Sequence, residues 1–286
     1  MDSILVTGGT GTLGHHVVRR LRDAGRDVRV LTRRTGGREE SGLHFVTGDL
    51  LSGAGIGAAV DGATTIIHCA GSSTGDEVAT AHLVDAASRA GRPHLVHISV
   101  VGAERIPISG RIDRMLFGYF EMKRKAEEVV AGSGLPWTTI RATQFHDLIF
   151  MVVEKLAKLP IVPVPSGVSF QPVETDEVAA RLVELSLGSP SGLVPDIAGP
   201  CAHTAAELVH AFLRATHRRR LLLPLWLPGK AAQGLRAGAN LAPECAVGRR
   251  TWEEFLTERV SIPSRTRVAT ATSPETARAT RGSGTP

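Results

Sequence analysis

The chain has 286 residues, of which 42% are hydrophobic, enough to bury a complete core, and its formal net charge is +5. Four arginines and one acid in its last stretch account for much of that charge, so the basic balance does not predict a nucleic-acid partner. No apolar run is long enough to span a bilayer, so no membrane partner is expected.

The first predicted strand leads into a glycine-rich loop. Residues 3–6 form a short apolar run, and residues 15–24 have the apolar spacing of a helix. Glycine lets a backbone approach a pyrophosphate, and a helix that follows it presents free N–H groups to the anion. The context predicts a dinucleotide-binding loop rather than an unliganded turn. The residues expected to hold the cofactor here are Gly8, Thr10, Gly11, Thr12, Leu13 and Gly14.

The second predicted strand, residues 27–32, indicates which dinucleotide is bound. An NAD-preferring fold usually has an acid after this strand for the ribose 2′-hydroxyl. Arg33 and Arg34 stand there instead, and two guanidinium groups can pair with a 2′-phosphate. We therefore expect NADP(H) in preference to NAD(H). The alternative is a solvated basic strand end.

Further strands are predicted at 43–50, 64–71, 95–99 and 137–141, with helices at 53–60 and 77–90. Strands that alternate with helices predict an α/β fold, a Rossmann-type doubly wound parallel sheet. Ligands of such sheets lie outside the carboxyl ends of the strands. We therefore expect one cleft bordered by Asp49, Leu50, Ala70, Gly71 and Ser99.

Tyr119, the only tyrosine of the chain, lies four residues before Lys123, and the helix-favouring sequence 121–131 places both on one helix face. A free phenol has a pKa near 10 and is a poor proton donor or acceptor at neutral pH. An adjacent ammonium group is expected to lower that pKa. Lys123 is also expected to bind the nicotinamide ribose. The alternative is an ordinary helix with a half-buried tyrosine and a surface lysine.

The loop after the strand at 137–141 is expected at the same edge of the sheet. Thr143 and Gln144 are candidates to contact the nicotinamide amide, with Gln144 at the substrate side, and Phe145 and His146 to line the substrate pocket. For His146, a helix-start histidine without chemistry is the equal alternative. Trp226, in the apolar segment 221–227, is expected to shape the pocket with a helix at 230–239. An apolar lining suits an apolar or aromatic substrate.

Several of these segments together resemble the short-chain dehydrogenase/reductase superfamily, in its atypical NmrA-like branch. The resemblance runs from about residue 4 to 256 and rests on residues 7–14, 48–50, 68–71, 98–102, 119–123 and 134–141. It implies that Asp49 borders the adenine, that Ala70 and Gly71 border the nicotinamide-side ribose, and that Tyr119 and Lys123 are catalytic.

The same resemblance implies a serine or threonine near the end of the fifth strand that polarises the substrate carbonyl. Ser99 is the candidate, but Val100 follows it where many relatives carry a second hydroxyl. If the working position is Val100, the catalytic set is incomplete, and Ser109 is an alternative donor. A weakly polarised site would suit an activated substrate such as a quinone.

The sequence thus predicts an NAD(P)H-dependent oxidoreductase that reduces a small carbonyl, quinone or enone compound, with Tyr119 as proton donor. The alternatives are a non-catalytic NADP(H)-binding redox sensor of NmrA type and an interaction protein that keeps only the fold. We expect a dinucleotide-binding core at 1–160, an interleaved substrate lobe at 161–258 and a disordered basic tail at 259–286.

Three scattered cysteines indicate a reducing compartment, and a strand that starts at residue 3 leaves no room for a signal peptide, so a cytoplasmic location is expected. No metal site is expected. His203, His210 and His217 recur every seven residues on one predicted helix, and that spacing separates successive side chains by roughly 10 Å. A homodimer remains possible, although no surface patch in the sequence marks one.

Overall fold

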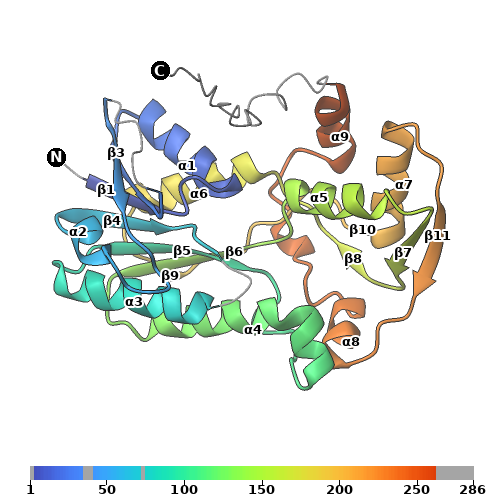
Figure 1. Ribbon diagram of the computed structural model, residues 1–286, viewed down its shortest axis with the longest axis horizontal. Coiled ribbons are helices and arrows are strands. Elements are labelled where there is room, and N and C mark those ends of the chain that lie inside the picture. Colours follow the sequence, from blue (N-terminus) through green and yellow to red (C-terminus); the bar gives the residue numbers. More distant parts are fainter. Residues whose placement is uncertain (1–2, 35–40, 72–74, 262–286) are drawn as a thin grey trace, which may run out of the picture.

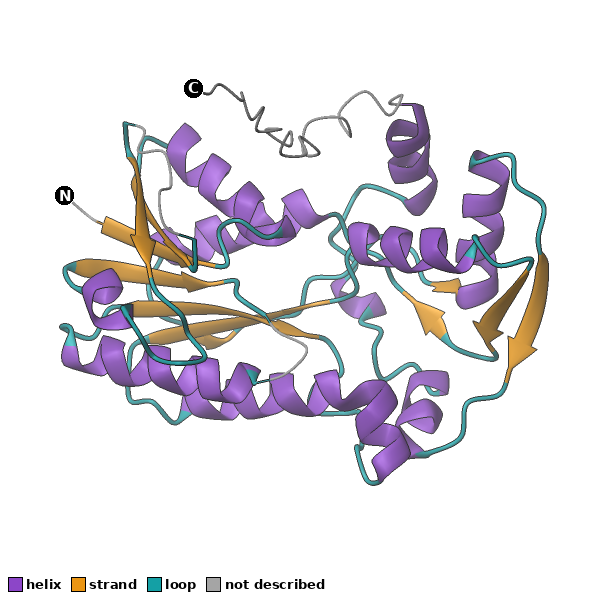
Figure 2. Cartoon of the chain, in the orientation of Figure 1, coloured by secondary structure: helices purple, strands orange, loops and turns teal. Residues whose placement is uncertain are grey.

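The computed structural model describes residues 3–34, 41–71 and 75–261, and a seven-stranded sheet organises its first half (Figures 1 and 2). The strand order is β3-β2-β1-β4-β5-β6-β9, and every neighbouring pair is parallel. The strands are β1 (Ser3–Thr7), β2 (Asp27–Thr32), β3 (Leu43–Thr47), β4 (Ala63–His68), β5 (His94–Val100), β6 (Trp137–Ala142) and β9 (Gly192–Leu193). The predicted doubly wound parallel sheet is confirmed.

Helices cover both faces of this sheet, because successive strand residues point to opposite sides and both sides are apolar. One face packs on α1 (Thr12–Asp23) and α6 (Thr175–Leu187). The other packs on α2 (Ile56–Val60), α3 (Asp76–Arg89) and α4 (Arg111–Ala131). Figure 1 shows α1 and α6 above the sheet and α3 and α4 below it.

The remaining elements form a smaller lobe beyond the carboxyl ends of the strands, on the right of Figure 1. A parallel pair, β7 (Ile161–Pro165) with β11 (Leu221–Leu225), and an antiparallel pair, β8 (Ser169–Phe170) with β10 (His203–Thr204), lie in it. Its helices are α5 (His146–Leu156), α7 (Ala205–Ala215), α8 (Lys230–Arg236), a 3₁₀ turn (Pro243–Cys245) and α9 (Trp252–Ser261). Phe212, Trp252 and Phe255 are at the centre of its core.

The two parts are interleaved along the chain. After β7 and β8 the chain returns to the large sheet to add α6 and β9, and only then completes the lobe. Asp176 at the start of α6 pairs with Arg19 at 2.7 Å and with Arg20 at 2.9 Å, both on α1. The core of the large sheet therefore includes a helix, α6, that lies after the boundary expected at residue 160.

Several predicted boundaries differ from the structure. The helix that carries Tyr119 begins at Arg111, ten residues before the predicted start at 121. The last strand of the sheet, β9, has only two residues, and beyond it Ile197 adds only an isolated bridge to Ala142. Residues 259–261, assigned to the tail, end α9, and the rest of that predicted tail lies outside the described residues.

The helices α7 and α6 begin differently. Thr204 caps α7: its hydroxyl accepts from the Glu207 N–H, and the Glu207 carboxylate accepts from the Thr204 N–H. Thr175 is instead the first residue of α6, whose N-cap is Glu174 and which has no side-chain cap. The Thr175 hydroxyl donates to Asp147 at 3.0 Å.

Candidate functional site

The loop between β1 and α1 is packed so closely that side chains would not fit in it. Gly8 has a φ of 69°, and a Cβ there would lie 2.6 Å from the backbone nitrogen of Ala70. A Cβ on Gly14 would lie 2.1 Å from the Gly8 carbonyl oxygen. These contacts bring the backbone of the loop against the start of α1 and the end of β4.

The amino end of α1 is open to an anion. Its N-cap is Gly11, no side chain caps it, and its first turn holds no acidic residue. The first N–H groups of a helix have no partner within the helix, and they carry its positive dipole end. This end, with Thr10, Thr12 and Leu13 around it, fits a pyrophosphate.

Thr7, the last residue of β1, ties the loop to the segment after β4. Its carbonyl accepts from the Cys69 N–H at 3.1 Å, and its hydroxyl accepts from the Ala70 N–H at 3.3 Å. Ala70 and the exposed Gly71 are thereby held beside the glycine loop. Of the strand-end residues predicted to border one cleft, Ala70 and Gly71 lie beside the glycine loop.

The ends of β2 and β3 form the other side of the candidate cleft. Arg33 and Arg34 are exposed, and the Arg34 N–H donates to the Thr32 hydroxyl at 3.2 Å. The Gly48 N–H donates to the Thr32 carbonyl at 2.9 Å, which sets Asp49 and Leu50 next to this corner. The Asp49 carboxylate accepts from the Leu51 N–H at 3.0 Å, so it closes its own turn.

Lys123, on α4, forms a buried ion pair that the sequence analysis did not foresee. Its Nζ lies 2.9 Å from Oδ2 of Asp76, the first residue of α3, and both side chains are almost fully buried. Nζ also lies 3.6 Å from where a Cβ of Gly71 would be. Burial acts to lower the pKa of Lys123, but Tyr119 and Asp76 raise it above its usual value, so the ammonium stays charged.

Tyr119 lies one turn before Lys123, whose Nζ is 6.0 Å from the centre of its ring. The residue is partly buried, with 44% of its surface exposed, and its pKa is raised above its usual value. Loss of water around the buried part of the phenol is the main cause, Lys123 opposes it, and Asp76 adds to it. Lys123 does act to lower the pKa, as expected, but the burial of the phenol outweighs it and the net shift is upward.

A line of buried polar groups joins the glycine loop to this ion pair. Thr7 lies 2.7 Å from Nδ1 of His68, and Nε2 of His68 lies 3.2 Å from the Thr80 hydroxyl. That hydroxyl donates to the Asp76 carbonyl, so it accepts from His68 Nε2–H. Thr7 then donates to Nδ1 of a neutral ring.

Burial and the nearby Lys123 lower the pKa of His68 to about 4, which keeps the ring neutral. His97 stacks on it with ring centres 5.5 Å apart, and burial, Lys123 and His68 hold the pKa of His97 well below its usual range. Burial also raises the pKa of the Cys69 thiol to about 12, against the opposing effect of Lys123.

The third predicted catalytic group, Ser99, is buried in β5 on the face covered by α4, and its hydroxyl has no hydrogen-bond partner among the described residues. Its neighbour Val100 points to the opposite side, because strand residues alternate. Ser109, the alternative donor, is engaged elsewhere, since its hydroxyl lies 3.1 Å from the Asp113 carboxylate. Ser99 is thus the hydroxyl that remains available.

The loop after β6 is more structural than predicted. Thr143 is buried, its N–H donates to the Ile197 carbonyl, and its hydroxyl accepts from the Gly199 N–H at 3.4 Å. Phe145 packs against the core of the large sheet. Gln144 keeps a buried carbonyl oxygen without a partner among the described residues, and of these three side chains it alone retains a free polar group.

His146 does not line a pocket. It is fully buried, with its ring stacked 5.1 Å from Phe255 and 5.9 Å from Trp252, both on α9. Its Nδ1 lies 3.4 Å from Glu174. Although partial burial acts to raise it, the pKa of Glu174 lies below its usual value because His146 and Arg250 stabilise the carboxylate. The prediction of a substrate contact is not supported, since α9 encloses the ring.

Trp226 is also far from the predicted arrangement. It is 66% exposed just after β11, and the Arg236 guanidinium lies 4.0 Å from the centre of its ring. The predicted helix that follows is present as α8. An exposed indole covered on one face by an arginine does not shape an enclosed pocket.

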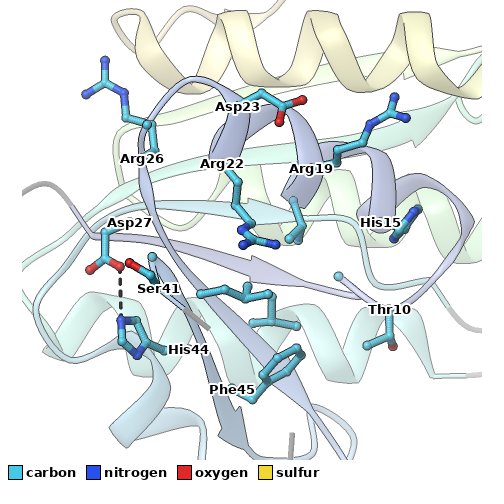
Figure 3. Close-up of a pocket in the computed structure, with 16 residues that line it drawn as sticks. Thr10, His15, Arg19, Arg22, Asp23, Arg26, Asp27, Ser41, His44 and Phe45 are labelled. Carbon is cyan, nitrogen blue, oxygen red and sulfur yellow. Dashed lines mark ion pairs between the residues drawn. The ribbon is translucent and has the colours of Figure 1, made fainter. Parts of the chain in front are cut away.

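A groove of about 1100 Å³ runs along the outer edge of the sheet between α1 and β3 (Figure 3). Gly9 and Thr10 line one end, so it adjoins the glycine loop. Figure 3 shows Arg22 pointing into it, while Asp27 and His44 pair at 3.2 Å at its far end. The groove holds neither Tyr119 nor Lys123, so we place the candidate chemistry at the strand ends instead.

Sequence reasoning missed four residues of the site: His68, Asp76, Thr80 and His97. For the two histidines a signal existed, because each follows two apolar residues within a strand, His68 at the end of β4 and His97 in the middle of β5. Asp76 and Thr80 stand one helical turn apart at the start of α3, but nothing in the sequence links them to Lys123. Among the described residues no group of three or more potential ligands is arranged to hold a metal ion.

Comparison with known proteins agrees with this geometry. A family model described as NAD(P)H-binding matches residues 8–184. A (4-alkanoyl-5-oxo-2,5-dihydrofuran-3-yl)methyl phosphate reductase from Streptomyces griseus is 30% identical over 208 residues, which cover 71% of this chain and 70% of that protein. An NAD(P)H azoreductase from Xenophilus azovorans is 27% identical over 84% of this chain and 83% of its own.

The chloroplast protein TIC 62 from Pisum sativum is 31% identical over 48% of this chain, but the match spans only 32% of the pea protein. An NADPH-dependent quinone oxidoreductase from Escherichia coli, solved with NADPH, superposes with a TM-score of 0.74 at 17% identity, over 90% of this chain and 99% of that one. At that identity the likeness concerns the fold alone.

The fold and the glycine loop define a dinucleotide-binding α/β protein. The chain belongs to the NAD(P)H-binding family, in agreement with the resemblance drawn from its sequence. No helix among the described residues is both long and apolar enough to cross a membrane.

Proposed function

We propose that the protein is an NADPH-dependent reductase of a small apolar or aromatic carbonyl, quinone or enone compound. The observation that carries the proposal is the convergence of two features at the same strand ends. The uncapped amino end of α1 offers N–H groups to a pyrophosphate, and Lys123 lies within 3.6 Å of a Cβ position on Gly71, beside the segment that follows β4. The reductase names of the Streptomyces and Xenophilus relatives support the same class.

The cofactor, when bound, supplies a hydride at its nicotinamide ring. Lys123, kept charged beside Asp76, orients the nicotinamide-side ribose through its ammonium. Tyr119 is protonated at neutral pH, as any phenol with a pKa of about 10 or above is, and it donates that proton to the oxygen of the reduced substrate as the hydride arrives. Ser99 offers its unpartnered hydroxyl to the same oxygen. A phenol held in this form favours reduction over the reverse reaction.

NADPH is proposed over NADH because two exposed arginines follow β2. A charge-assisted hydrogen bond contributes roughly 1.5–3 kcal/mol. Arg33→Ala/Arg34→Ala is expected to weaken NADPH binding by about tenfold or more and to leave NADH binding unchanged, as measured by fluorescence titration. Arg89→Ala/Arg124→Ala removes the same charge from exposed positions of α3 and α4 and is the matched control. Equal losses for both cofactors would contradict a 2′-phosphate contact.

The decisive experiment follows NADPH absorbance with a panel of quinones, aromatic ketones and enones, with NADH alongside. Tyr119→Phe is expected to lower kcat by about 10²–10⁴-fold, the usual contribution of a positioned proton donor. The wild-type rate is expected to stay level from neutral pH to about pH 10 and to fall above it, because the protonated phenol is the working form. Turnover that survives the substitution would contradict a proton from Tyr119.

A non-catalytic NADP(H) sensor is the second candidate, and one observation favours it. Lys123 is bound to Asp76 rather than directed only at the phenol, and in the described part of the chain no group hydrogen-bonds to the Ser99 hydroxyl, so the catalytic set is loosely organised. NADPH binding with no turnover on the whole panel would support this reading, and a search for protein partners would follow.

A further inference from the structure

The parallel pair β7–β11 presents an apolar face to solvent. Ile161 stands beside Leu221, Pro163 beside Leu223 and Pro165 beside Leu225. Because strand residues alternate, these six side chains share one face, which we call the ribbon face. The four Ile and Leu residues among them are 45–72% exposed. The alternate residues Val162, Val164 and Leu222 point the other way, into the core of the lobe.

Scattered exposed apolar residues are normal, but a contiguous apolar patch usually marks a contact surface. Trp226, directly after β11, adds another apolar side chain at the end of this strand pair, and it is two-thirds exposed. Figure 1 shows the pair at the end of the molecule away from the large sheet, so the ribbon face is not part of the cleft at the strand ends. It therefore calls for a partner other than the substrate.

The segments that contain β7 and β11 are rich in basic residues. The segments 155–165 and 214–230 contain seven lysines and arginines and no acid. Those residues are Lys155, Lys158, Arg214, Arg218, Arg219, Arg220 and Lys230. Arg218, Arg219 and Arg220 lie directly before β11, and Arg220 is fixed there because its Nε donates to the Ala157 carbonyl at 3.1 Å.

A second groove lies at this basic end. It has a volume of about 500 Å³ and is lined, apart from Leu213, only by arginines and histidines: His210, Arg214, His217, Arg218, Arg219 and Arg220. Without a carboxylate among its lining residues, it is suited to a phosphate group. An apolar surface next to such a groove is complementary to a lipid bilayer, where apolar chains lie directly below phosphate headgroups.

We propose that the ribbon face docks on the surface of an anionic phospholipid bilayer, with Leu221, Leu223 and Trp226 entering the acyl boundary and the arginines at phosphate level. Aromatic and long basic side chains favour this boundary, because each has an apolar body and a polar end. Each lysine or arginine near an anionic surface contributes about 1 kcal/mol, or roughly fivefold in affinity. Such a contact needs no membrane-spanning helix and so revises the expectation that no membrane partner exists.

Other occupants fit less well. A second copy on a twofold axis would bring seven positive charges against their own image, within about one Debye length of 8 Å. Strand addition at the edges is hindered because Pro163, Pro165 and Pro224 have no N–H to donate. The chain's last stretch carries four arginines and one glutamate, so it would also be repelled. A nucleic acid would use the charge and leave the apolar face uncovered.

The test is co-sedimentation of the full chain with vesicles of phosphatidylcholine alone and with vesicles that contain phosphatidylglycerol. We expect binding to the anionic vesicles only, weakened by high salt. Arg218→Ala/Arg219→Ala is expected to lower the partition by about thirtyfold. Leu221→Ser/Leu223→Ser is expected to lower it by at least tenfold. The matched controls, Arg89→Ala/Arg124→Ala for charge and Met115→Ser for exposed apolar surface, should bind as the unchanged chain does.

Fluorescence gives a second readout, since of the three tryptophans only Trp226 is strongly exposed. Anionic vesicles should shift the emission to the blue, and Trp226→Phe should abolish the shift while the protein still sediments. NADPH binding and the thermal unfolding midpoint show that each variant remains folded.

Three results would overturn the proposal. The first is an absence of vesicle binding by the full chain. The second is vesicle binding that Leu221→Ser/Leu223→Ser leaves intact, or DNA binding as strong as vesicle binding that only Arg218→Ala/Arg219→Ala weakens. Either result would indicate a surface that binds any polyanion. The third is a dimer in sedimentation velocity that the leucine variant dissociates, which would assign the ribbon face to a second copy.

Discussion

Lys123 forms a buried ion pair with Asp76. From the sequence Lys123 was expected to interact only with the phenol and the cofactor, whereas its Nζ lies 2.9 Å from the Asp76 carboxylate. Removing one charge of a buried ion pair is costly, because the remaining charge then has neither water nor a counter-ion.

Asp76→Asn is therefore expected to destabilise the protein by about 3–5 kcal/mol, the usual result of leaving a buried charge unpaired. Adding Lys123→Met should restore most of this loss, since both charges are then gone. Urea unfolding of the single and double variants measures the difference. If the single variant is as stable as the unchanged chain, water reaches the pair and the ammonium is not truly buried.

His68 makes stability depend on pH. Its pKa is about 4 in the folded protein and 6.5 in the unfolded chain, so the unfolded state takes up a proton first as pH falls. Its contribution is complete above pH 6.5 and is lost between pH 6.5 and about 4, by about 3 kcal/mol in total. Urea unfolding at pH 7, 5.5 and 4.5 checks this. His68→Asn should remove the part of the pH dependence of the unfolding free energy that this ring causes. The control, His210→Asn at an exposed position, should leave that pH dependence as it is.

At the scale of single residues, the sequence predicted the glycines and the Tyr119–Lys123 pair because their spacing alone defines their geometry. It did not predict Asp76, which meets Lys123 only when α3 and α4 pack side by side. Of the two readings of His146, the structure agrees with the helix-start histidine without chemistry. The sequence could not decide between them, because α9, which covers the ring, lies about a hundred residues later in the chain.

At the scale of elements, the turn from β1 into α1 depends on the absence of side chains. Gly14→Ala is expected to abolish NADPH binding and to lower the unfolding midpoint, because its Cβ would lie 2.1 Å from a backbone oxygen that cannot move aside. Gly57→Ala, on α2, meets nothing within 4 Å and serves as control, with unchanged binding. Titration with NADPH and thermal unfolding measure both. Normal binding by Gly14→Ala would mean that the loop relaxes freely.

The strands of the large sheet were predicted because each is a short apolar run, and a parallel sheet buried on both faces requires such runs. The start of α4 was missed because residues 111–120 include glycine and aromatic residues that do not favour a helix on their own. The pairing of β7 with β11 joins segments about sixty residues apart, and no local pattern reports a contact of that range.

At the scale of the whole molecule, α6 makes one unit of two parts. It packs on α1, and its apolar residues share a core with Val17 and Leu21 of that helix. A chain that ends at residue 160 should therefore fail to fold, since α1 and its side of the sheet would lose their cover. A chain that ends at residue 261 should keep the NADPH affinity and the single unfolding transition of the full protein. Circular dichroism and urea unfolding measure both, and a stable fold at 160 residues would contradict the shared core.

The return of α6 to α1 also has a consequence for synthesis. α1 is complete at residue 23, but the helix that covers it ends at residue 187. At translation rates of about 5–20 residues per second, the apolar side of α1 waits for roughly ten to thirty seconds on the ribosome. The nascent chain must pass that interval with its first helix uncovered, so chaperones that bind apolar segments during translation have time to act on α1.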